Sequence, residues 1–351
     1  MAPQVAEEAA PKKKKPVRRK APSYVTEPTF GNPTAGDFTQ GEDPAVRDAA
    51  VRALGNYNGS VVVVDSNNGR ILTTVNQKLA LSSGYVPCST IKLAAGLAAL
   101  KEGLVEPQTK VQFKGGWSMN MIDGLAISNN VYFAHLGQKL GFERVKEYAH
   151  LFGFGEKAGW QIEGEQLGEF SETEHKLGVG RMTSFGDGIS VTPLQLAAFV
   201  SAIANGGTLY YLQAPRTETE IETFTPHVKR QLPIADLIPG LELGMREAVK
   251  RGTGRNARVP GQFVWGKTGT CSQWEQRKRT RLGWFASFNE AEGHRLAVVV
   301  LLRGGPMVYG PRAAEVAGNV YRNLSEQDYF SSKPAADSIV SLGLESCCSA
   351  P

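Results

Sequence analysis

Residues 60–75 have the sequence Ser-Val-Val-Val-Val-Asp-Ser-Asn-Asn-Gly-Arg-Ile-Leu-Thr-Thr-Val. Two runs rich in β-branched residues, 60–65 and 70–75, flank Asn67-Asn68-Gly69. Such runs favour strands, and Asn-Gly between them is a strong signal for the turn of a β-hairpin. We therefore predict two antiparallel strands at this point of the chain.

The strands that could extend this hairpin lie far along the chain. Residues 263–270, 281–289 and 296–303 have the pattern of three successive strands, and a helix is predicted from about 312 to 323. Helices are also predicted at 45–54, 89–104, 129–140, 142–152 and 193–205. Runs of strands and helices, without strict alternation, are typical of an α+β fold with an antiparallel sheet. The hairpin would have to join the C-terminal strands to make one sheet.

Two of the predicted helices carry start signals. Ser89 stands at the expected N-cap of the helix 89–104, because a serine side chain can accept a hydrogen bond from the first turn. Thr192-Pro193 opens the helix 193–205, and Gly206-Gly207 closes it.

Charge is concentrated at one end of the chain. The sequence has 351 residues and a net charge of +5, and residues 1–20 hold seven lysines and arginines against two glutamates. The rest is therefore neutral, and we expect no nucleic-acid surface on the folded domain. We predict a disordered basic tail over 1–42, a folded domain over 43–325 and a second tail over 326–351.

No export signal is visible in this sequence. The longest apolar stretch, near 194–204, is shorter than the roughly 20 residues that a membrane span needs. The basic run near the start is followed by Ala-Pro-Ser-Tyr and not by an apolar segment, so it is not a secretory signal.

Ser89-Thr90-Ile91-Lys92 places a hydroxyl and an amine three residues apart at a predicted helix start. This spacing puts both groups on one face of a helix. A serine becomes a nucleophile when a base takes its proton, and Lys92 could be that base if burial or a nearby positive charge lowers its pKa. Backbone N–H groups at the helix start would favour an oxyanion. Taken alone, the pattern also fits a capped helix with a surface lysine.

Two further motifs could complete a site. Ser128-Asn129-Asn130 opens an amphipathic helix, which can present short polar side chains to a cleft. Lys267-Thr268-Gly269-Thr270 ends a predicted strand, where the glycine allows close approach of a ligand and the cation and hydroxyls would suit an anion. Each motif also has an ordinary interpretation, as a helix cap or as a polar strand end.

The three motifs, in this order, resemble the penicillin-binding transpeptidase family, which shares its fold with the serine β-lactamases. The resemblance covers roughly residues 55–325 and extends to other segments, which are Gly164-Glu165, Ser184-Phe185-Gly186, 192–197, 204–207, Gly252-Thr253-Gly254 and Trp284-Phe285. It implies an antiparallel sheet of about five strands flanked by helices, with an all-helical subdomain.

The resemblance also implies catalytic roles. Ser89 would be the acylated nucleophile, and Lys92 would accept its proton. Ser128, held by Lys92 and Lys267, would relay protons to the leaving amine, and Asn130 would hydrogen-bond the substrate amide. We expect the three motifs to meet so that one serine hydroxyl lies between the two lysine amines, which would depress each other's pKa.

The substrate implied by the resemblance is a peptidoglycan stem peptide ending in D-Ala-D-Ala, and a β-lactam would acylate the same serine. Thr268, Gly269 and Thr270, assisted by Lys267, would bind the terminal carboxylate. The backbone N–H groups of Ser89 and Thr270 would form the oxyanion hole. The family chemistry needs no metal or cofactor, and its partners include other cell-wall synthesis proteins.

Two cysteines depart from the family pattern. Cys88 stands where glycine is usual, and Cys271 follows Thr270. In some carbapenem-hydrolysing β-lactamases, cysteines at the matching positions form a disulfide, so the resemblance implies a Cys88–Cys271 disulfide and an oxidising compartment. The alternative is a pair of buried thiols.

Three functions are compatible with these residues. The first is a transpeptidase or D,D-carboxypeptidase at the outer face of the cell envelope, which conflicts with the missing export signal and suggests a truncated or misassigned start. The second is a serine β-lactamase, although residues 161–170 do not match the Glu-x-x-Leu-Asn loop of one such class. The third is a non-enzymatic β-lactam-binding or sensing module.

Overall fold

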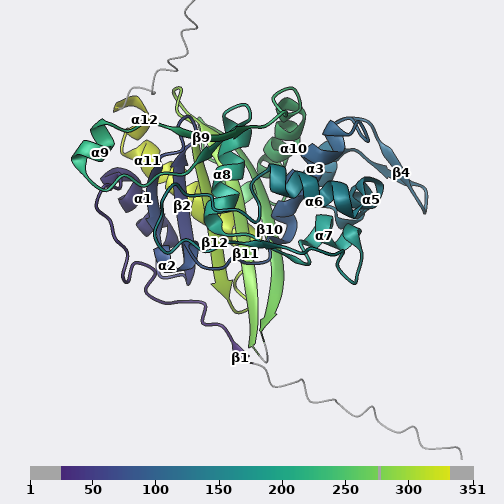
Figure 1. Ribbon diagram of the computed structural model, residues 1–351, viewed down its shortest axis with the longest axis horizontal. Helices are drawn as coiled ribbons and strands as arrows, with labels where there is room; N and C mark the ends of the chain where they lie inside the picture. The colour runs from purple at the N-terminus through teal and green to yellow at the C-terminus, as the bar shows by residue number, and fades with distance from the viewer. Residues whose placement is uncertain (1–24, 276–277, 333–351) are drawn as a thin grey trace, which may run out of the picture.

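The computed structural model describes residues 25–332 except 276–277, and helices cover both faces of one central sheet (Figure 1). The antiparallel strands follow the order β10-β11-β12-β2-β3, and the two-residue strand β1 pairs in parallel with β11. The bounds are β1 Val25–Thr26, β2 Gly59–Asp65, β3 Ile71–Val75, β10 Phe263–Glu275, β11 Lys278–Glu290 and β12 Leu296–Gly304. The prediction that the hairpin joins the C-terminal strands is confirmed, because β2 pairs with β12.

The central valines of β2 explain why this strand is buried on both faces. Successive side chains of a strand point to opposite faces of its sheet. Val61 and Val63 therefore enter the core under α1 (Pro44–Leu54) and α11 (Gly310–Glu326), whereas Val62 and Val64 enter the larger core that includes α8 (Pro193–Ala204). The sheet is thus a middle layer between helices (Figure 1).

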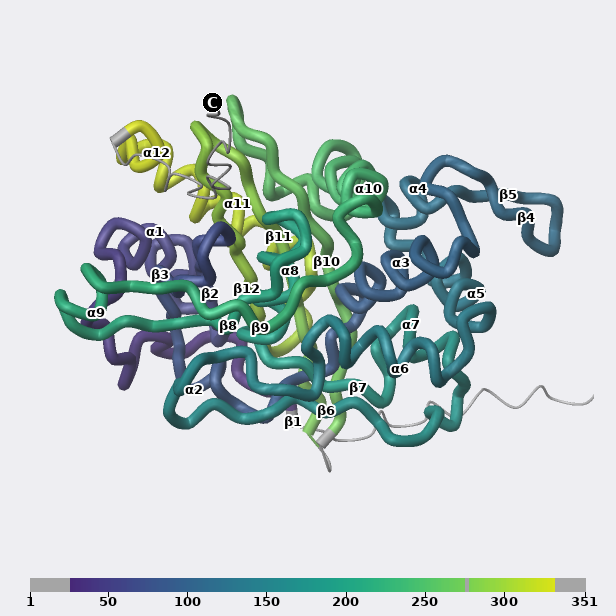
Figure 2. Tube along the Cα trace, turned by 45° about the horizontal axis from the view of Figure 1, so that its top comes forward, coloured from purple at the N-terminus to yellow at the C-terminus, as the bar shows by residue number. Residues whose placement is uncertain are grey.

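The predicted helical subdomain is present and lies beside the β10 edge of the sheet (Figure 2). It contains α3 (Lys92–Lys101), α4 (Met121–Ala126), α5 (Asn130–Leu140), α6 (Phe142–Leu151) and α7 (Val179–Phe185). Helix α10 (Ile238–Lys250) contacts both α4 and β10, so it joins the subdomain to the sheet. Within the described residues, no helix is long and apolar enough to cross a membrane.

Short elements complete the described chain. They are α2 (Gln77–Ala80), the 3-10 helices η1 (Cys88–Ile91) and η2 (Arg255–Ala257), α9 (Glu218–Glu222), α12 (Tyr329–Ser332), and the strand pairs β4–β5 (Val111–Phe113, Trp117–Met119), β6–β7 (Glu169–Phe170, Ile189–Ser190) and β8–β9 (Thr208–Tyr211, His227–Gln231).

The predicted helix start at Ser89 is wrong, whereas the one at Thr192 is confirmed. Cys88 has a positive φ of 52°, and the 3-10 turn η1 precedes α3, which begins only at Lys92. No side chain caps either start. Thr192 and Gln195 form a reciprocal capping box at the start of α8.

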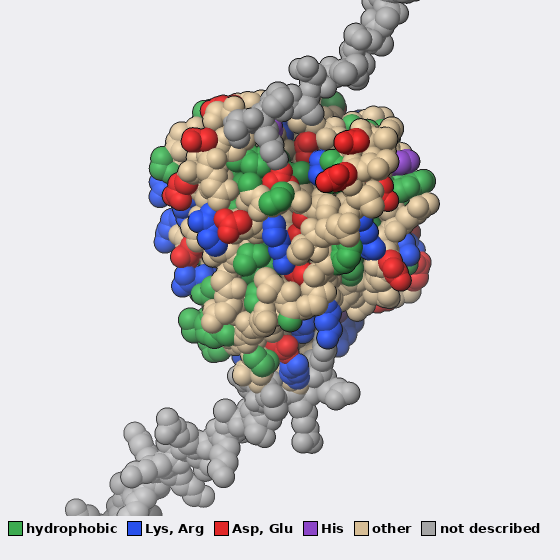
Figure 3. All heavy atoms as spheres, turned by 90° about the vertical axis from the view of Figure 1, so that its left-hand side faces the viewer, with side chains coloured by type: hydrophobic (Ala, Val, Ile, Leu, Met, Phe, Trp, Pro, Cys, Tyr) green, Lys and Arg blue, Asp and Glu red, His purple; other side chains and the backbone are tan. Residues whose placement is uncertain are grey.

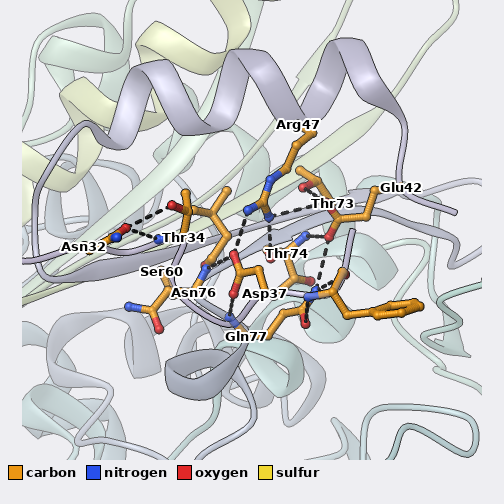
Figure 4. A network of polar contacts seen from close by, with 12 residues as sticks. Asn32, Thr34, Asp37, Glu42, Arg47, Ser60, Thr73, Thr74, Asn76 and Gln77 are labelled. Atoms are coloured by element: carbon orange, nitrogen blue, oxygen red, sulfur yellow. Dashed lines mark hydrogen bonds and ion pairs between the residues drawn. The ribbon is translucent and has the colours of Figure 1, made fainter. Parts of the chain in front are cut away.

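The predicted tail boundary at residue 42 needs correction, because residues 25–42 bind to the domain. The carboxylate of Asp37, whose side chain is 2% exposed, pairs with Arg47 at 2.7 Å and accepts hydrogen bonds from the backbone N–H groups of Asn76 and Gln77 (Figure 4). Glu42 accepts from the N–H of Thr74. These polar contacts join distant segments, so the composition of the segment does not reveal them.

The C-terminal boundary also shifts. Helix α11 continues to Glu326, and the side chains of Tyr329 and Phe330 in α12 are buried. Residues 1–24 and 333–351, which make up the rest of the predicted tails, lie outside the described residues.

Acidic and basic side chains are mixed on the face of the molecule shown in Figure 3. This mixture agrees with the neutral charge balance of the chain after residue 20. That the domain has no nucleic-acid surface stays a prediction.

Candidate active site

The turn η1 presents Ser89 at the edge of the helical subdomain. The residue is half-buried, and its hydroxyl makes no hydrogen bond to any described residue. Its backbone N–H lies in the first turn of a 3-10 helix, where N–H groups lack partners within the helix. The turn itself is closed by Thr90, whose N–H and hydroxyl both donate to the carbonyl of Pro87. Ser89 therefore combines an unengaged hydroxyl with a firmly held backbone.

Lys92 is the first residue of α3, and its side chain is fully buried. Its Nζ donates to the backbone carbonyl of Ser128 at 2.7 Å, to the Ser128 hydroxyl at 3.2 Å and to Oδ1 of Asn130 at 2.6 Å. Burial disfavours the charged form and lowers the pKa of Lys92 from 10.5 to about 7. Lys92 can therefore take up and release a proton near neutral pH.

Lys267 approaches the same serine from the sheet. It lies in β10, is fully buried, and donates from Nζ to the Ser128 hydroxyl at 2.8 Å and to the carbonyl of Thr268 at 3.0 Å. Burial and, to a smaller extent, the charge of Lys92 hold the pKa of Lys267 well below its ordinary value. The charge of Lys92 thus adds to the cost of a charged Lys267.

The hydroxyl between the two amines is that of Ser128, in the position that the family resemblance implied. Ser128 lies in the turn between α4 and α5 with a positive φ of 58°, and this left-handed conformation turns its side chain towards both lysines. Such strained conformations in non-glycine residues are concentrated at functional sites. The structure therefore brings together Lys92, Ser128, Asn130 and Lys267 by hydrogen bonds.

No carboxylate in the described part of the chain hydrogen-bonds or pairs with Lys92 or Lys267. A buried ammonium is costly unless a counter-charge accompanies it. A bound anion would supply that charge, so a site that contains these two lysines is suited to an anionic ligand.

Gly269 brings β10 against the Ser89 turn. A Cβ at this position would lie 3.0 Å from the carbonyl oxygen of Pro87 and 3.2 Å from the Cβ of Cys88. Any larger residue would push the strand away from the turn. The two flanking threonines differ in exposure, since Thr268 is buried and Thr270 is exposed.

The predicted disulfide between Cys88 and Cys271 is present, with 5.6 Å between the two Cα atoms. It joins the residue before Ser89 to the residue after Thr270, so it ties the turn to β10 covalently. Trp284 of β11 adds a second tie, because its Nε1 donates to the carbonyl of Val86.

Removing this disulfide is expected to destabilise the protein strongly. The bond closes a loop between residues 183 positions apart, and cross-links over long loops restrict the unfolded chain most. We expect C88S/C271S to lower the free energy of unfolding by about 3–5 kcal/mol in denaturant titrations. A reductant should lower the stability of the parent protein and leave that of C88S/C271S unchanged. Equal stability of the two proteins under oxidising conditions would contradict a structural role.

Sequence reasoning gave no role to two residues that contact the site. The hydroxyls of Thr253 and Thr268 lie 2.6 Å apart, and the N–H of Gly310 donates to the hydroxyl of Thr270 at 2.7 Å. The Gly252-Thr253-Gly254 segment was part of the family resemblance, which could have pointed to the first contact. Gly310-Pro311 signals only a helix start.

Glu165, from the Gly164-Glu165 segment of the resemblance, hydrogen-bonds the backbone. Its buried carboxylate accepts hydrogen bonds from the backbone N–H groups of Ala158 and Gly159. Burial raises its pKa despite these bonds.

Comparisons with known proteins place this geometry in context. The family model of the penicillin binding protein transpeptidase domain matches residues 59–326. Stage V sporulation protein D of Bacillus subtilis is 33% identical over 279 residues, which cover 71% of this chain and 43% of that protein. Peptidoglycan D,D-transpeptidase MrdA of Acinetobacter baumannii is 26% identical over 372 residues, which cover 84% of this chain and 54% of that protein. The chain thus spans about half the length of these relatives.

A solved structure has the same fold. Penicillin binding protein 3 of Mycobacterium tuberculosis, complexed with aztreonam, superposes with a TM-score of 0.64 at 24% identity, covering 80% of this chain and 75% of that one.

Proposed function

This chain belongs to the penicillin-binding protein transpeptidase family, and from that premise we propose that it is a serine D,D-transpeptidase acting on peptidoglycan stem peptides. The observation that carries the proposal is the Ser128 hydroxyl held between two buried lysines, one of which, Lys92, lies three residues after Ser89 in the chain. The relative named as a peptidoglycan D,D-transpeptidase supports the reaction class.

Acylation would begin at Ser89. Its Oγ attacks the carbonyl carbon of the penultimate D-Ala while the neutral amine of Lys92 takes the hydroxyl proton. Lys92 is poised for this step because its pKa of about 7 leaves a large neutral fraction at neutral pH. The peptide C–N bond then breaks, an ester forms on Ser89, and the terminal D-Ala leaves as an amine.

Ser128 would supply the proton that the leaving amine needs. Its hydroxyl lies 3.2 Å from Nζ of Lys92 and 2.8 Å from Nζ of Lys267, so it can pass a proton to the substrate and recover one from a lysine. When an acceptor attacks the ester, the same groups would transfer protons in the opposite direction.

Side chains from the helical subdomain and from β10 would both orient the substrate. Because Oδ1 of Asn130 accepts from Lys92, its NH₂ group is left to donate to a substrate amide carbonyl. Thr268 and Thr270, with Lys267, would bind the terminal carboxylate, and Gly269 gives the strand its close approach. A bound carboxylate would favour protonated Lys267, while burial keeps the pKa of Lys92 low.

The developing oxyanion would be stabilised by the backbone N–H groups of Ser89 and Thr270. These two residues lie on the elements that the Cys88–Cys271 disulfide joins. Donors held in place before the reaction stabilise such charge without reorganisation cost.

The acceptor decides the product. An amine from another stem peptide would give a cross-link, and water would give carboxypeptidase activity. A β-lactam would acylate Ser89 in the same way, as a family member solved with aztreonam suggests. Such catalysis would take place at the outer face of the cell envelope, where the disulfide would be maintained and where other cell-wall synthesis proteins would be partners.

One assay tests this function. The protein is incubated with a fluorescent penicillin and, separately, with a D-Ala-D-Ala peptide, and both adduct lifetime and D-Ala release are followed. A long-lived adduct with D-Ala release supports the proposal. Rapid penicillin turnover would instead indicate a β-lactamase, and a stable adduct without peptide turnover a sensing module. Residues 161–170 do not match the Glu-x-x-Leu-Asn loop of one β-lactamase class, and the Glu165 carboxylate in this segment accepts hydrogen bonds from the N–H groups of Ala158 and Gly159.

A further inference from the structure

We propose that Thr253 is a positioning residue that turns Thr268 into a hydrogen-bond donor, so that the site selects an ionised carboxylate over a neutral group. This inference rests on the proposed function. It concerns a residue outside the three motifs, at the turn that follows α10.

The contact between the two threonine side chains carries the inference. Their hydroxyl oxygens lie 2.6 Å apart, and Thr268 is 4% exposed. Each hydroxyl has a single proton, so one of the pair donates and the other accepts. When Thr268 donates its proton to a ligand anion, its hydrogen bond with Thr253 can persist only if Thr253 is the donor of that bond. The hydroxyl of Thr253 therefore favours the donating orientation of Thr268.

Thr270 has a similar arrangement, in which the direction of the hydrogen bond is fixed. The backbone N–H of Gly310 donates to the Thr270 hydroxyl at 2.7 Å, which leaves that hydroxyl's proton for a ligand. Gly310 is the first residue of the 17-residue helix α11, whose N-terminus favours negative charge. A Cβ on Gly310 would lie 2.8 Å from the Cβ of Thr268 and 2.9 Å from the carbonyl oxygen of Gly269, so only glycine permits this approach.

The backbone around Thr253 is held independently of its hydroxyl. The N–H of Thr253 donates to the carbonyl of Ala126, and a Cβ on Gly252 would lie 2.0 Å from the same oxygen. Arg251 pairs with Asp123 of α4. Because α4 ends two residues before Ser128, this turn connects the Ser128 segment to the strand that carries Thr268. Removing only the hydroxyl should therefore leave the turn in place.

The consequence is selectivity for charge. A carboxylate offers only acceptors, so two hydroxyls that are both set to donate match it fully. An amide or an ester at the same place offers one carbonyl acceptor and no charge. Chains of hydrogen bonds also strengthen one another, so Thr253 would act most strongly on the anionic ligand.

The test compares T253V, which removes the hydroxyl at nearly constant volume, with T253S, which retains it. Second-order acylation rates are measured with benzylpenicillin and with its methyl ester. We expect T253V to lose about 5- to 10-fold with the carboxylate, the size of one ordinary hydrogen bond, and less than about 2-fold with the ester. T253S should retain the ratio of the two rates.

The outcomes separate this inference from the proposed function. A parent protein that benzylpenicillin does not acylate would contradict the proposed function and, with it, the role of Thr253. An acylated parent with an unchanged carboxylate-to-ester ratio in T253V, or an equal loss of that ratio in T253S, would overturn the role of Thr253 alone. Equal thermal unfolding of the parent and both variants would confirm that the ratio reports on the hydroxyl and not on folding.

Discussion

S89A is expected to lose penicillin labelling and D-Ala release completely, at least about a thousandfold below the parent protein, because no other group would form the ester. The fold should remain intact, since the Ser89 hydroxyl makes no hydrogen bond to a described residue. Labelling by fluorescent penicillin, with unfolding measured on the same preparation, checks both statements.

The chain offers a matched control for this substitution. Ser118 also begins a Ser-x-Asn sequence, but it lies in the short strand β5 and not in the Ser128 turn. S118A should retain labelling within about twofold, because the half-buried Ser118 lies in the β4–β5 pair, which is separate from the central sheet. Covalent labelling of S89A at the parent rate would contradict Ser89 as the nucleophile and would redirect attention to Ser128.

K92M is expected to reduce the acylation rate by about 10²- to 10⁴-fold, the range usual for loss of a general base. Methionine keeps an unbranched side chain, one heavy atom shorter than that of lysine, and has no amine to accept a proton. The control is K101M, at the last residue of α3, where the lysine is exposed and the rate should stay unchanged.

The role of Lys92 as the base also predicts how the acylation rate changes with pH. Burial lowers the pKa of Lys92 from 10.5 to about 7, so the amine of the folded protein is protonated and inactive as a base well below pH 7. The acylation rate of the parent should rise with pH through about 7 and then level off. Because an unfolded chain keeps this proton up to about 10.5, stability should also rise with pH between those values. A flat acylation profile from pH 5 to 9, or a limb that persists in K92M, would exclude Lys92 as the base.

The elements of the fold were largely predictable because their signals are local. The β-branched runs of β2 and β3, the strands of the C-terminal third and the Thr192 capping box are each encoded within a few residues. The start of α3 was not, because the left-handed conformation of Cys88 and its bond to Cys271 depend on a strand far along the chain. The contacts of Asp37 with Asn76 and Gln77 escaped prediction for the same reason.

By itself, the sequence determined which side chains bear the chemistry. Hydroxyls, amines and cysteines in ordered motifs are readable from spacing, and the family resemblance implied the disulfide that the structure contains. Only the tertiary structure decided how near the Ser128 hydroxyl lies to each lysine amine, how far burial lowers the pKa of Lys92, and that Thr253 contacts Thr268. These properties depend on desolvation and on the distance between atoms of remote segments, neither of which local sequence patterns specify.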